Sequence, residues 1–195
     1  MKELKAKTSA QTHRHQRPLG KNGVLRGTFL VLSLIAIAVI ASALAYTLYF
    51  QETPGGTGQR APGFTLTDLD GQGFSLSDYR GRVVLLDFMA TWCPLCAEEM
   101  KKLKGLQQKY AGDVAIISIG IDPTESDQTL KNFRQEAGAE WRFARDTDAL
   151  FEKYEVDLIP KLVLIDKRGY IRLISIQGSK SLSELSAEID RLLTE

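Results

Sequence analysis

The sequence predicts an α/β fold in which a central mixed β-sheet is flanked by helices. The main observation is the order of the patterns after residue 80: strand, helix, strand, and later strand, strand, helix. A strand–helix–strand unit favours a parallel pair joined by a right-handed crossover, and two strands joined by a short turn favour an antiparallel hairpin. Two features precede this core: an N-terminal β-hairpin extension and, before it, one expected transmembrane helix.

The length and the distribution of charge divide the chain into four parts. Its 195 residues, 44% of them hydrophobic, suffice for one packed domain with an appendage. Residues 1–27 carry seven bases and one acid, whereas the remaining chain carries 18 bases and 23 acids. We expect a basic cytoplasmic tail (1–27), a transmembrane signal-anchor helix (28–50), a flexible linker (51–62) and a packed α/β domain (63–195).

Residues 28–50 are 23 consecutive uncharged residues, mostly Leu, Ile, Val and Ala. At 1.5 Å per residue, a helix of this length crosses a hydrocarbon core of roughly 30 Å. Aromatic residues gather at its far end, and the basic cluster precedes it, which predicts a cytoplasmic N-terminus and a C-terminal domain on the outer, periplasmic or extracellular, side of the cell membrane. The alternative is a cleaved signal peptide, since Ala43-Leu44-Ala45 fits a small-x-small cleavage site, and the domain would then be secreted.

The basic tail is better explained by membrane lipid than by nucleic acid. His13, His15 and the tail's bases have no interleaved aromatic residues and lie directly before the uncharged segment. After that segment, residues 53–62 are rich in Gly and Pro, with only Arg60 charged, which is typical of a flexible tether. We therefore expect lipid contact through residues 28–50 and no nucleic-acid partner.

The soluble part opens with two alternating runs, Phe64-Thr-Leu-Thr-Asp and Phe74-Ser-Leu-Ser, separated by Asp70-Gly71-Gln72-Gly73. This pattern predicts a β-hairpin. Residues 83–89 are an apolar run interrupted by Asp87, typical of a strand buried on both faces, and a helix is expected from Cys93 to about Tyr110.

The second half of the domain alternates in the same way. Residues 114–121 predict a buried strand, residues 125–137 a helix ended by Gly138, and residues 148–154 a shorter helix. Residues 161–166 and 170–176 are expected to form strands joined by a tight turn. The apolar face of a closing helix is marked by Leu182, Leu185, Ile189, Leu192 and Leu193.

The chain has two cysteines, which are too few for the disulfide framework of a small secreted scaffold or for a tetrahedral zinc site. The two histidines lie on the other side of the predicted membrane. We therefore expect no metal and no cofactor, and the spacing within Trp92-Cys93-Pro94-Leu95-Cys96 becomes the main functional signal.

This motif predicts an asymmetric pair. At the strand-to-helix turn, Cys93 would cap the helix, where backbone N–H groups and the helix dipole lower the pKa of its thiol. Pro94 suits the first helical position, and Cys96, one turn further along, would be more buried. Cys93 is the expected nucleophile and Cys96 the resolving thiol of a redox-active disulfide. A static disulfide is the alternative, which the position after a buried strand disfavours.

The stretch Asp87-Phe-Met-Ala-Thr-Trp-Cys-Pro-Leu-Cys-Ala-Glu-Glu-Met100 resembles the active-site region of the thioredoxin superfamily, and in particular its membrane-tethered TlpA/ResA-like branch. The resemblance covers roughly residues 60–195, including Ile159-Pro160 and the following Leu-Val-Leu-Ile-Asp-Lys-Arg-Gly. It implies a thioredoxin-like fold and a thiol-disulfide oxidoreductase of the protein-disulfide reductase type. Its partners would be protein disulfide or dithiol substrates and an upstream membrane or exported electron donor.

The resemblance also implies roles for two acids. Asp87 matches the buried acid of thioredoxin, where burial raises the pKa of the carboxyl and lets it exchange a proton with Cys96. Glu99 matches a glutamate near the disulfide of ResA-like proteins and shares a helix face with Cys96. The alternatives are a solvated strand end for Asp87 and ordinary surface charges for Glu98 and Glu99.

Four residues are expected to bind substrate: Trp92, Pro94, Ile159 and Pro160. Pro160 matches the family's cis-proline, which leaves the backbone of Ile159 free to pair with an extended substrate segment. Trp92 offers apolar contact area to a substrate. The alternatives are an ordinary core aromatic for Trp92 and a proline that simply begins a strand for Pro160.

Two departures from the family pattern concern redox properties. The dipeptide between the cysteines, Pro94-Leu95, is neither the Gly-Pro of thioredoxin nor the x-Pro usual in the tethered branch, so the motif does not define the direction of electron flow. Lys161 stands where relatives more often carry a small residue or Thr, and we expect its charge to favour the thiolate nearby.

Two other functions compete with this one. A peroxiredoxin-like peroxidase would resemble the pattern Pro-x-x-x-Thr-x-x-Cys, but Leu86 and Ala90 occupy those positions before Cys93. A copper-binding metallochaperone module is compatible with two thiolates, which suit Cu(I), but it would be favoured by a CxxxC spacing and a distant histidine, and the domain has neither.

Overall fold

The computed structural model describes residues 31–44 and 58–195, which belong to two compact units divided after Gln51. In the first unit, residues 31–44 are helical with exposed side chains. The basic tail, the ends of the expected span at 28–30 and 45–50, and residues 51–57 lie outside the described residues. Within the described ranges, no helix combines the length and the apolar character that crossing a membrane requires.

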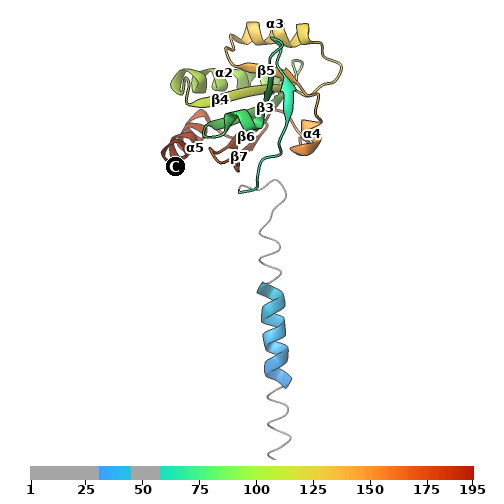
Figure 1. Ribbon diagram of the computed structural model, residues 1–195, viewed down its shortest axis with the longest axis vertical. Coiled ribbons are helices and arrows are strands. Elements are labelled where there is room, and N and C mark those ends of the chain that lie inside the picture. The colour runs from blue at the N-terminus through green and yellow to red at the C-terminus, as the bar shows by residue number, and fades with distance from the viewer. Residues whose placement is uncertain (1–30, 45–57) are drawn as a thin grey trace, which may run out of the picture. The chain divides into compact units, whose positions relative to one another are not determined.

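The second unit is built on a five-stranded mixed sheet in the order β5-β4-β3-β6-β7 (Figure 1). Strands β3, β4 and β5 run parallel to one another, whereas β6 is antiparallel to β3 and β7 is antiparallel to β6. This confirms the mixed sheet predicted from the sequence. The strands are β3 (Val83–Met89), β4 (Val114–Gly120), β5 (Arg142–Arg145), β6 (Lys161–Ile165) and β7 (Ile171–Ile176).

Helices cover the sheet, and each has a local reason to begin or end where it does. Ser126 and Ser181 cap the N-termini of α3 and α5 through their hydroxyl oxygens, and Gly138 ends α3 in the left-handed conformation that favours glycine. The helices are α2 (Pro94–Lys109), α3 (Asp127–Ala137), α4 (Leu150–Lys153) and α5 (Leu182–Thr194), with a 3-10 helix η1 (Leu76–Tyr79).

The alternation of side chains along β3 divides the core between the two faces of the sheet. Leu85 and Met89 pack into one cluster, together with apolar residues of α2, α3 and α5. Leu86 and Phe88 pack into the other cluster, with the N-terminal hairpin and α4. A strand covered on both faces is apolar at almost every position, which is why β3 and β4 were recognisable in the sequence.

The opening hairpin is formed by β1 (Thr65–Thr67) and β2 (Gly73–Ser75), with Leu66 opposite Phe74. Its second strand is shorter than the alternating pattern suggested, because the chain turns into η1 at Leu76. The backbone N–H of Leu69 donates to the carbonyl of Phe143 at 2.9 Å. The hairpin therefore covers the β5 edge of the sheet.

Strand β5 lies in a stretch, residues 139–147, for which the sequence pattern predicts no element. It is short, and both its ends are arginines, so it lacks the apolar run that marks a central strand. Only Phe143 and Ala144 are buried, because β5 is the last strand of the sheet and pairs fully with β4 alone. A four-residue edge strand of this kind carries too little periodicity to be distinguished from a loop.

The linker expected over 51–62 needs correction at its C-terminal end. Residues 58–61 pair with the start of β7: the N–H of Ala61 donates to the carbonyl of Gly169, and the N–H of Ile171 donates to that of Gln59. Ala61 is buried, and the Tyr154 hydroxyl donates to the Pro62 carbonyl at 2.7 Å. The packed domain therefore includes these residues, since backbone pairing can order a segment whose composition suggests a tether.

Candidate active site

The two cysteines form a disulfide at the junction of β3 and α2, with their Cα atoms 5.2 Å apart. Cys93 caps α2 in an extended conformation, and its sulfur accepts the backbone N–H of Cys96 at 3.1 Å. Pro94 occupies the first turn, where no N–H donor is needed. The local geometry expected from the motif is confirmed, and the positive end of the α2 dipole favours negative charge on the Cys93 sulfur.

The two cysteines differ slightly in burial. Cys93 keeps 5% of its surface exposed, whereas Cys96 is completely buried one turn further along α2. Of the two cysteines, Cys93 is therefore the one nearer to solvent. This arrangement suits a pair in which one cysteine attacks an external partner and the other acts from within.

Asp87 lies between Leu85 and Met89 on β3 and, because side chains alternate along a strand, shares their face of the sheet, on which the two cysteines and α2 also pack. It is fully buried, so it does not end a strand on a solvated edge. Its Oδ2 accepts the hydroxyl of Ser118 at 2.7 Å, and its Oδ1 has no partner among the described residues. Burial raises the pKa of Asp87 to about 7; the Ser118 hydrogen bond opposes this rise, and the charge of Glu99 adds to it.

The neighbouring acids Glu98 and Glu99 differ sharply. Glu98 is exposed and pairs with Lys101 on the helix surface, whereas the Glu99 side chain is buried. Glu99 Oε2 lies 2.9 Å from Nζ of Lys102, which also donates to the carbonyls of Gly178 and Lys180 before α5, and Oε1 has no partner among the described residues. The surface-charge alternative therefore holds for Glu98 and fails for Glu99.

Trp92 is 65% exposed and is not a core aromatic. Its indole N–H donates to Oδ2 of Asp122 at 2.7 Å, which holds the ring against the β4–α3 loop. Hydrogen bonds from the hydroxyl and backbone N–H of Thr124, and then the one from Trp92, lower the pKa of Asp122. Leu95 and Leu158 are also exposed, so the first turn of α2 and the segment before Pro160 present apolar surface to solvent.

The peptide bond between Ile159 and Pro160 is cis, as the family resemblance implies. Pro160 directly precedes β6, whose first residue pairs with Phe88 near the end of β3. Ile159 packs against the same apolar cluster that contains Cys93 and Cys96. The antiparallel pairing of β6 with β3 thus brings this distant dipeptide to the disulfide.

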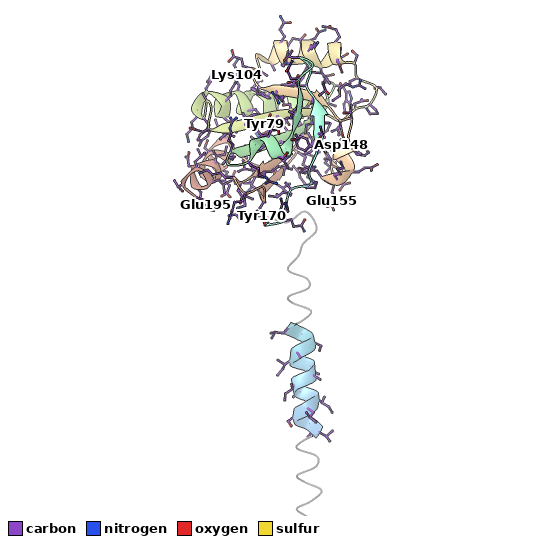
Figure 2. All side chains as sticks on the ribbon, viewed as in Figure 1. Tyr79, Lys104, Asp148, Glu155, Tyr170 and Glu195 are labelled. Atoms are coloured by element: carbon purple, nitrogen blue, oxygen red, sulfur yellow. A yellow bond between two sulfur atoms is a disulfide. The ribbon has the colours of Figure 1, made fainter. Side chains whose placement is uncertain are left out.

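Lys161 does not act on the cysteines, and the expectation that its charge favours the thiolate is wrong. Its partner Phe88 belongs to the cluster on the opposite face of the sheet. The buried ammonium donates to the carbonyls of Tyr154 at 2.7 Å and Glu155 at 2.6 Å (Figure 2 labels Glu155, after α4). Burial lowers the pKa of Lys161, and the charges of Glu155 and Asp157 oppose that effect. Lys161 therefore holds the end of α4.

Three further residues, Glu125, Ser118 and Trp141, support the site without having been predicted from the sequence. Oε1 of the buried Glu125 accepts both the backbone N–H, at 2.8 Å, and the hydroxyl of Thr91, two residues before Cys93. Ser118 contacts Asp87, and the indole N–H of Trp141 donates to Ser118 at 2.9 Å. None of these positions carries a local signal, since each acquires its role from a contact with a different strand or loop.

The described residues contain no cluster of three His, Cys, Asp or Glu side chains that could hold a metal ion. The chemically reactive features are an accessible cysteine, a buried partner cysteine and a buried carboxyl with a raised pKa, arranged on a mixed sheet beside a cis-proline. Together they define a thiol-disulfide oxidoreductase.

Comparison with known proteins agrees with this class. The chain belongs to the AhpC/TSA family, whose model matches residues 57–174, and it is TlpA/ResA-like within that family. The thiol-disulfide oxidoreductase ResA of Bacillus cereus (strain ATCC 10987 / NRS 248) is 30% identical over 168 residues, which cover 84% of this chain and 96% of ResA. The thioredoxin-like protein YneN of Bacillus subtilis (strain 168) is 31% identical and covers 68% of this chain and 78% of YneN.

The solved structures show the same fold. The thioredoxin domain of a thiol-disulfide oxidoreductase from Bacteroides vulgatus superposes with a TM-score of 0.62 at 25% identity, over 71% of this chain and 98% of that domain. The thioredoxin-like α/β fold expected from the resemblance is therefore confirmed.

Proposed function

We propose that the protein reduces disulfide bonds of protein substrates outside the cytoplasm, with Cys93 as nucleophile and Cys96 as resolving thiol. The observation that carries the proposal is the difference in burial between the two cysteines, because Cys93 alone of the pair keeps some exposed surface. ResA-like relatives are named thiol-disulfide oxidoreductases, which supports the same chemistry here.

The reaction of the reduced enzyme begins when the Cys93 thiolate attacks a substrate disulfide. A mixed disulfide forms, and the first substrate thiolate leaves and takes up a proton from water. The Cys96 thiol then loses its proton, attacks the Cys93 sulfur and forms the Cys93–Cys96 disulfide, while the second substrate thiolate leaves and is protonated. The substrate gains two electrons, which an upstream membrane or exported dithiol protein must return to the enzyme.

The two buried acids are assigned to proton transfer at Cys96. With a pKa of about 7, Asp87 is partly ionised near neutral pH, so it can take the proton from a thiol that solvent does not reach. Glu99 is buried on α2 together with Cys96, and its charge contributes to the raised pKa of Asp87. Its ion pair with the half-buried Lys102 provides a connection from this buried region towards solvent.

Substrate contact is assigned to the surface around Cys93. Trp92 and Pro94 are exposed beside it, and the backbone of Ile159, before the cis-proline, is placed to pair with an extended segment of the substrate. Such pairing orients the substrate disulfide without reading many side chains, which suits an enzyme that acts on proteins.

Reduction of insulin tests the activity. Full-length chain in detergent, kept reduced by dithiothreitol, is expected to precipitate the insulin B chain faster than dithiothreitol alone. The control is the same chain alkylated after reduction, which blocks the accessible thiol. Equal rates with active and alkylated chain would contradict the proposal, and rapid consumption of hydrogen peroxide by the reduced chain would favour the peroxidase alternative.

We also propose that residues 28–50 anchor the protein in the cell membrane, with residues 1–27 in the cytoplasm and the catalytic domain outside. The support is the uncharged length of this segment and the seven bases before it.

Cell fractionation tests the anchor. An epitope-tagged full-length chain is expected in the membrane pellet after alkaline washing, with the tag accessible to protease added to spheroplasts. Replacing both Ile35 and Val39 by Arg should reduce membrane insertion, because each charge costs about 3 kcal/mol at the centre of a span. A matched Ile35→Leu and Val39→Leu variant should behave as wild type. A shortened soluble exported product would favour signal cleavage, and a full-length soluble cytoplasmic chain would contradict both.

A further inference from the structure

Three buried polar side chains form a continuous chain across the centre of the sheet. Ser118 on β4 lies directly opposite Asp87 on β3, and its hydroxyl is 2.7 Å from Oδ2 of Asp87. On the other side, the indole nitrogen of Trp141 lies 2.9 Å from the same hydroxyl oxygen. Trp141 directly precedes β5 and stacks on Phe143, so its position is set by packing as well as by the hydrogen bond.

The chemistry of these groups gives the chain a direction. The indole N–H of Trp141 can only donate, so the Ser118 oxygen must accept from it. A serine hydroxyl has a single hydrogen, and the remaining partner of Ser118 is the Asp87 carboxyl. Ser118 therefore donates to Oδ2, which leaves Oδ1 as the oxygen that can hold a proton.

We propose that Ser118 and Trp141 are positioning residues that direct the exchangeable proton of Asp87 to Oδ1, the oxygen that accepts the proton of Cys96. This rests on the proposed function, in which Asp87 accepts the proton of Cys96. During resolution the S–H bond of Cys96 breaks, its electron pair stays on sulfur, and an O–H bond forms at Oδ1. Oδ2 keeps its hydrogen bond from Ser118 throughout, so the carboxyl does not need to rotate.

The other groups around Asp87 do not replace this donor. On the α2 side, Asp87 shares the face of the sheet on which the two cysteines pack, and the charge of Glu99, whose carboxylate is paired with Lys102, acts on it. From β6 it faces Leu162, its partner in the sheet. The residues of α3 and α5 in the same cluster are apolar: Leu130, Phe133, Ala137, Leu185, Ile189, Leu192 and Leu193. Within the described part of the chain, Ser118 is thus the hydrogen-bond donor that acts on the Asp87 carboxyl.

Carboxyl titration tests the proposal directly. The full-length oxidised chain, labelled with ¹³C at aspartate carboxyls, is titrated by NMR, and Asp87→Asn assigns the Asp87 resonance. Ser118→Ala is expected to raise the pKa of Asp87 by about one pH unit or more, because a hydrogen bond to the carboxylate is lost. Trp141→Phe should raise it by less, since the freed hydroxyl can then turn and accept from the protonated acid.

A double-mutant cycle separates direct from indirect effects. In the Ser118→Ala background, Trp141→Phe should cause no further rise, because Trp141 acts through Ser118. Ser118→Thr, which keeps a hydroxyl, should restore the wild-type pKa of Asp87. Ser175→Ala, a buried serine on β7 that bonds Ser179 and Lys180, is the matched control and should leave the pKa of Asp87 unchanged.

The proposal would be overturned by an unchanged Asp87 pKa in Ser118→Ala, or by an equal effect of Trp141→Phe with and without Ser118. Turnover gives a second readout: the acid limb of the rate of insulin reduction should move to higher pH with the pKa of Asp87 in Ser118→Ala. If Asp87→Asn leaves that limb in place, Asp87 is not the proton acceptor and the proposed function fails at this residue. The carboxyl titration still decides separately whether Ser118 and Trp141 position the acid.

Discussion

Replacing Cys93 by serine is expected to abolish disulfide reduction, leaving insulin precipitation at the rate of dithiothreitol alone. Cys93 is the less buried cysteine and the proposed nucleophile, and a serine hydroxyl is not ionised at neutral pH and does not form a disulfide. The loss should not be rescued at higher pH. Residual catalysis in Cys93→Ser would show that another group performs the first attack.

Replacing Cys96 by serine should also end turnover but with a different product. Cys93 can still attack, and the mixed disulfide then persists because no resolving thiol is present. We expect a covalent adduct with insulin or with the natural substrate, visible on a non-reducing gel and lost on reduction. Cys93→Ser is the matched control and should form no adduct. If Cys93→Ser forms adducts and Cys96→Ser forms none, the roles assigned to the two cysteines are reversed.

Asp87→Asn is expected to slow resolution by roughly 10²-fold near neutral pH, because the buried Cys96 thiol loses its proton acceptor. The wild-type rate should fall as pH drops through about 7, the pKa of Asp87, and this limb should be missing in the variant. Rapid-quench measurement of the mixed disulfide reports this step. Glu98→Gln, which removes an exposed carboxylate from the same helix, should leave the pH profile unchanged.

The Asp87→Asn substitution should also stabilise the fold at alkaline pH. The pKa of Asp87 is raised from 3.8 in the unfolded chain to about 7, so the native state binds the proton more tightly. Its contribution to stability is greatest below pH 3.8, is lost as pH rises towards 7, and amounts to about 4 kcal/mol over that window. The Asp87→Asn variant does not lose stability in this way. Its free energy of unfolding in urea, relative to wild type, should therefore be higher at pH 8 than at pH 5. An equal difference at both pH values would contradict the raised pKa.

Much of the fold could be read from local patterns. Strands β3 and β4 are apolar runs because both faces of the sheet are covered, and α5 shows a clear apolar stripe with a capping serine. Strand β5 was not predicted because an edge strand with an arginine at each end has no such pattern. The packing of residues 58–62 was not predicted because it depends on pairing with a strand more than a hundred residues away in the sequence.

The sequence by itself determined the asymmetric cysteine pair, because a proline after the first cysteine and an N-terminal helix position act within a few residues of one another. Only the tertiary structure decided what surrounds that pair. Strand register places Ser118 opposite Asp87 and brings Trp141 behind it, and the same register turns Lys161 away from the cysteines to the other face. Neighbours across a sheet depend on pairing between distant segments, and a side chain's face changes with a shift of one residue, so the single-sequence pattern does not contain them.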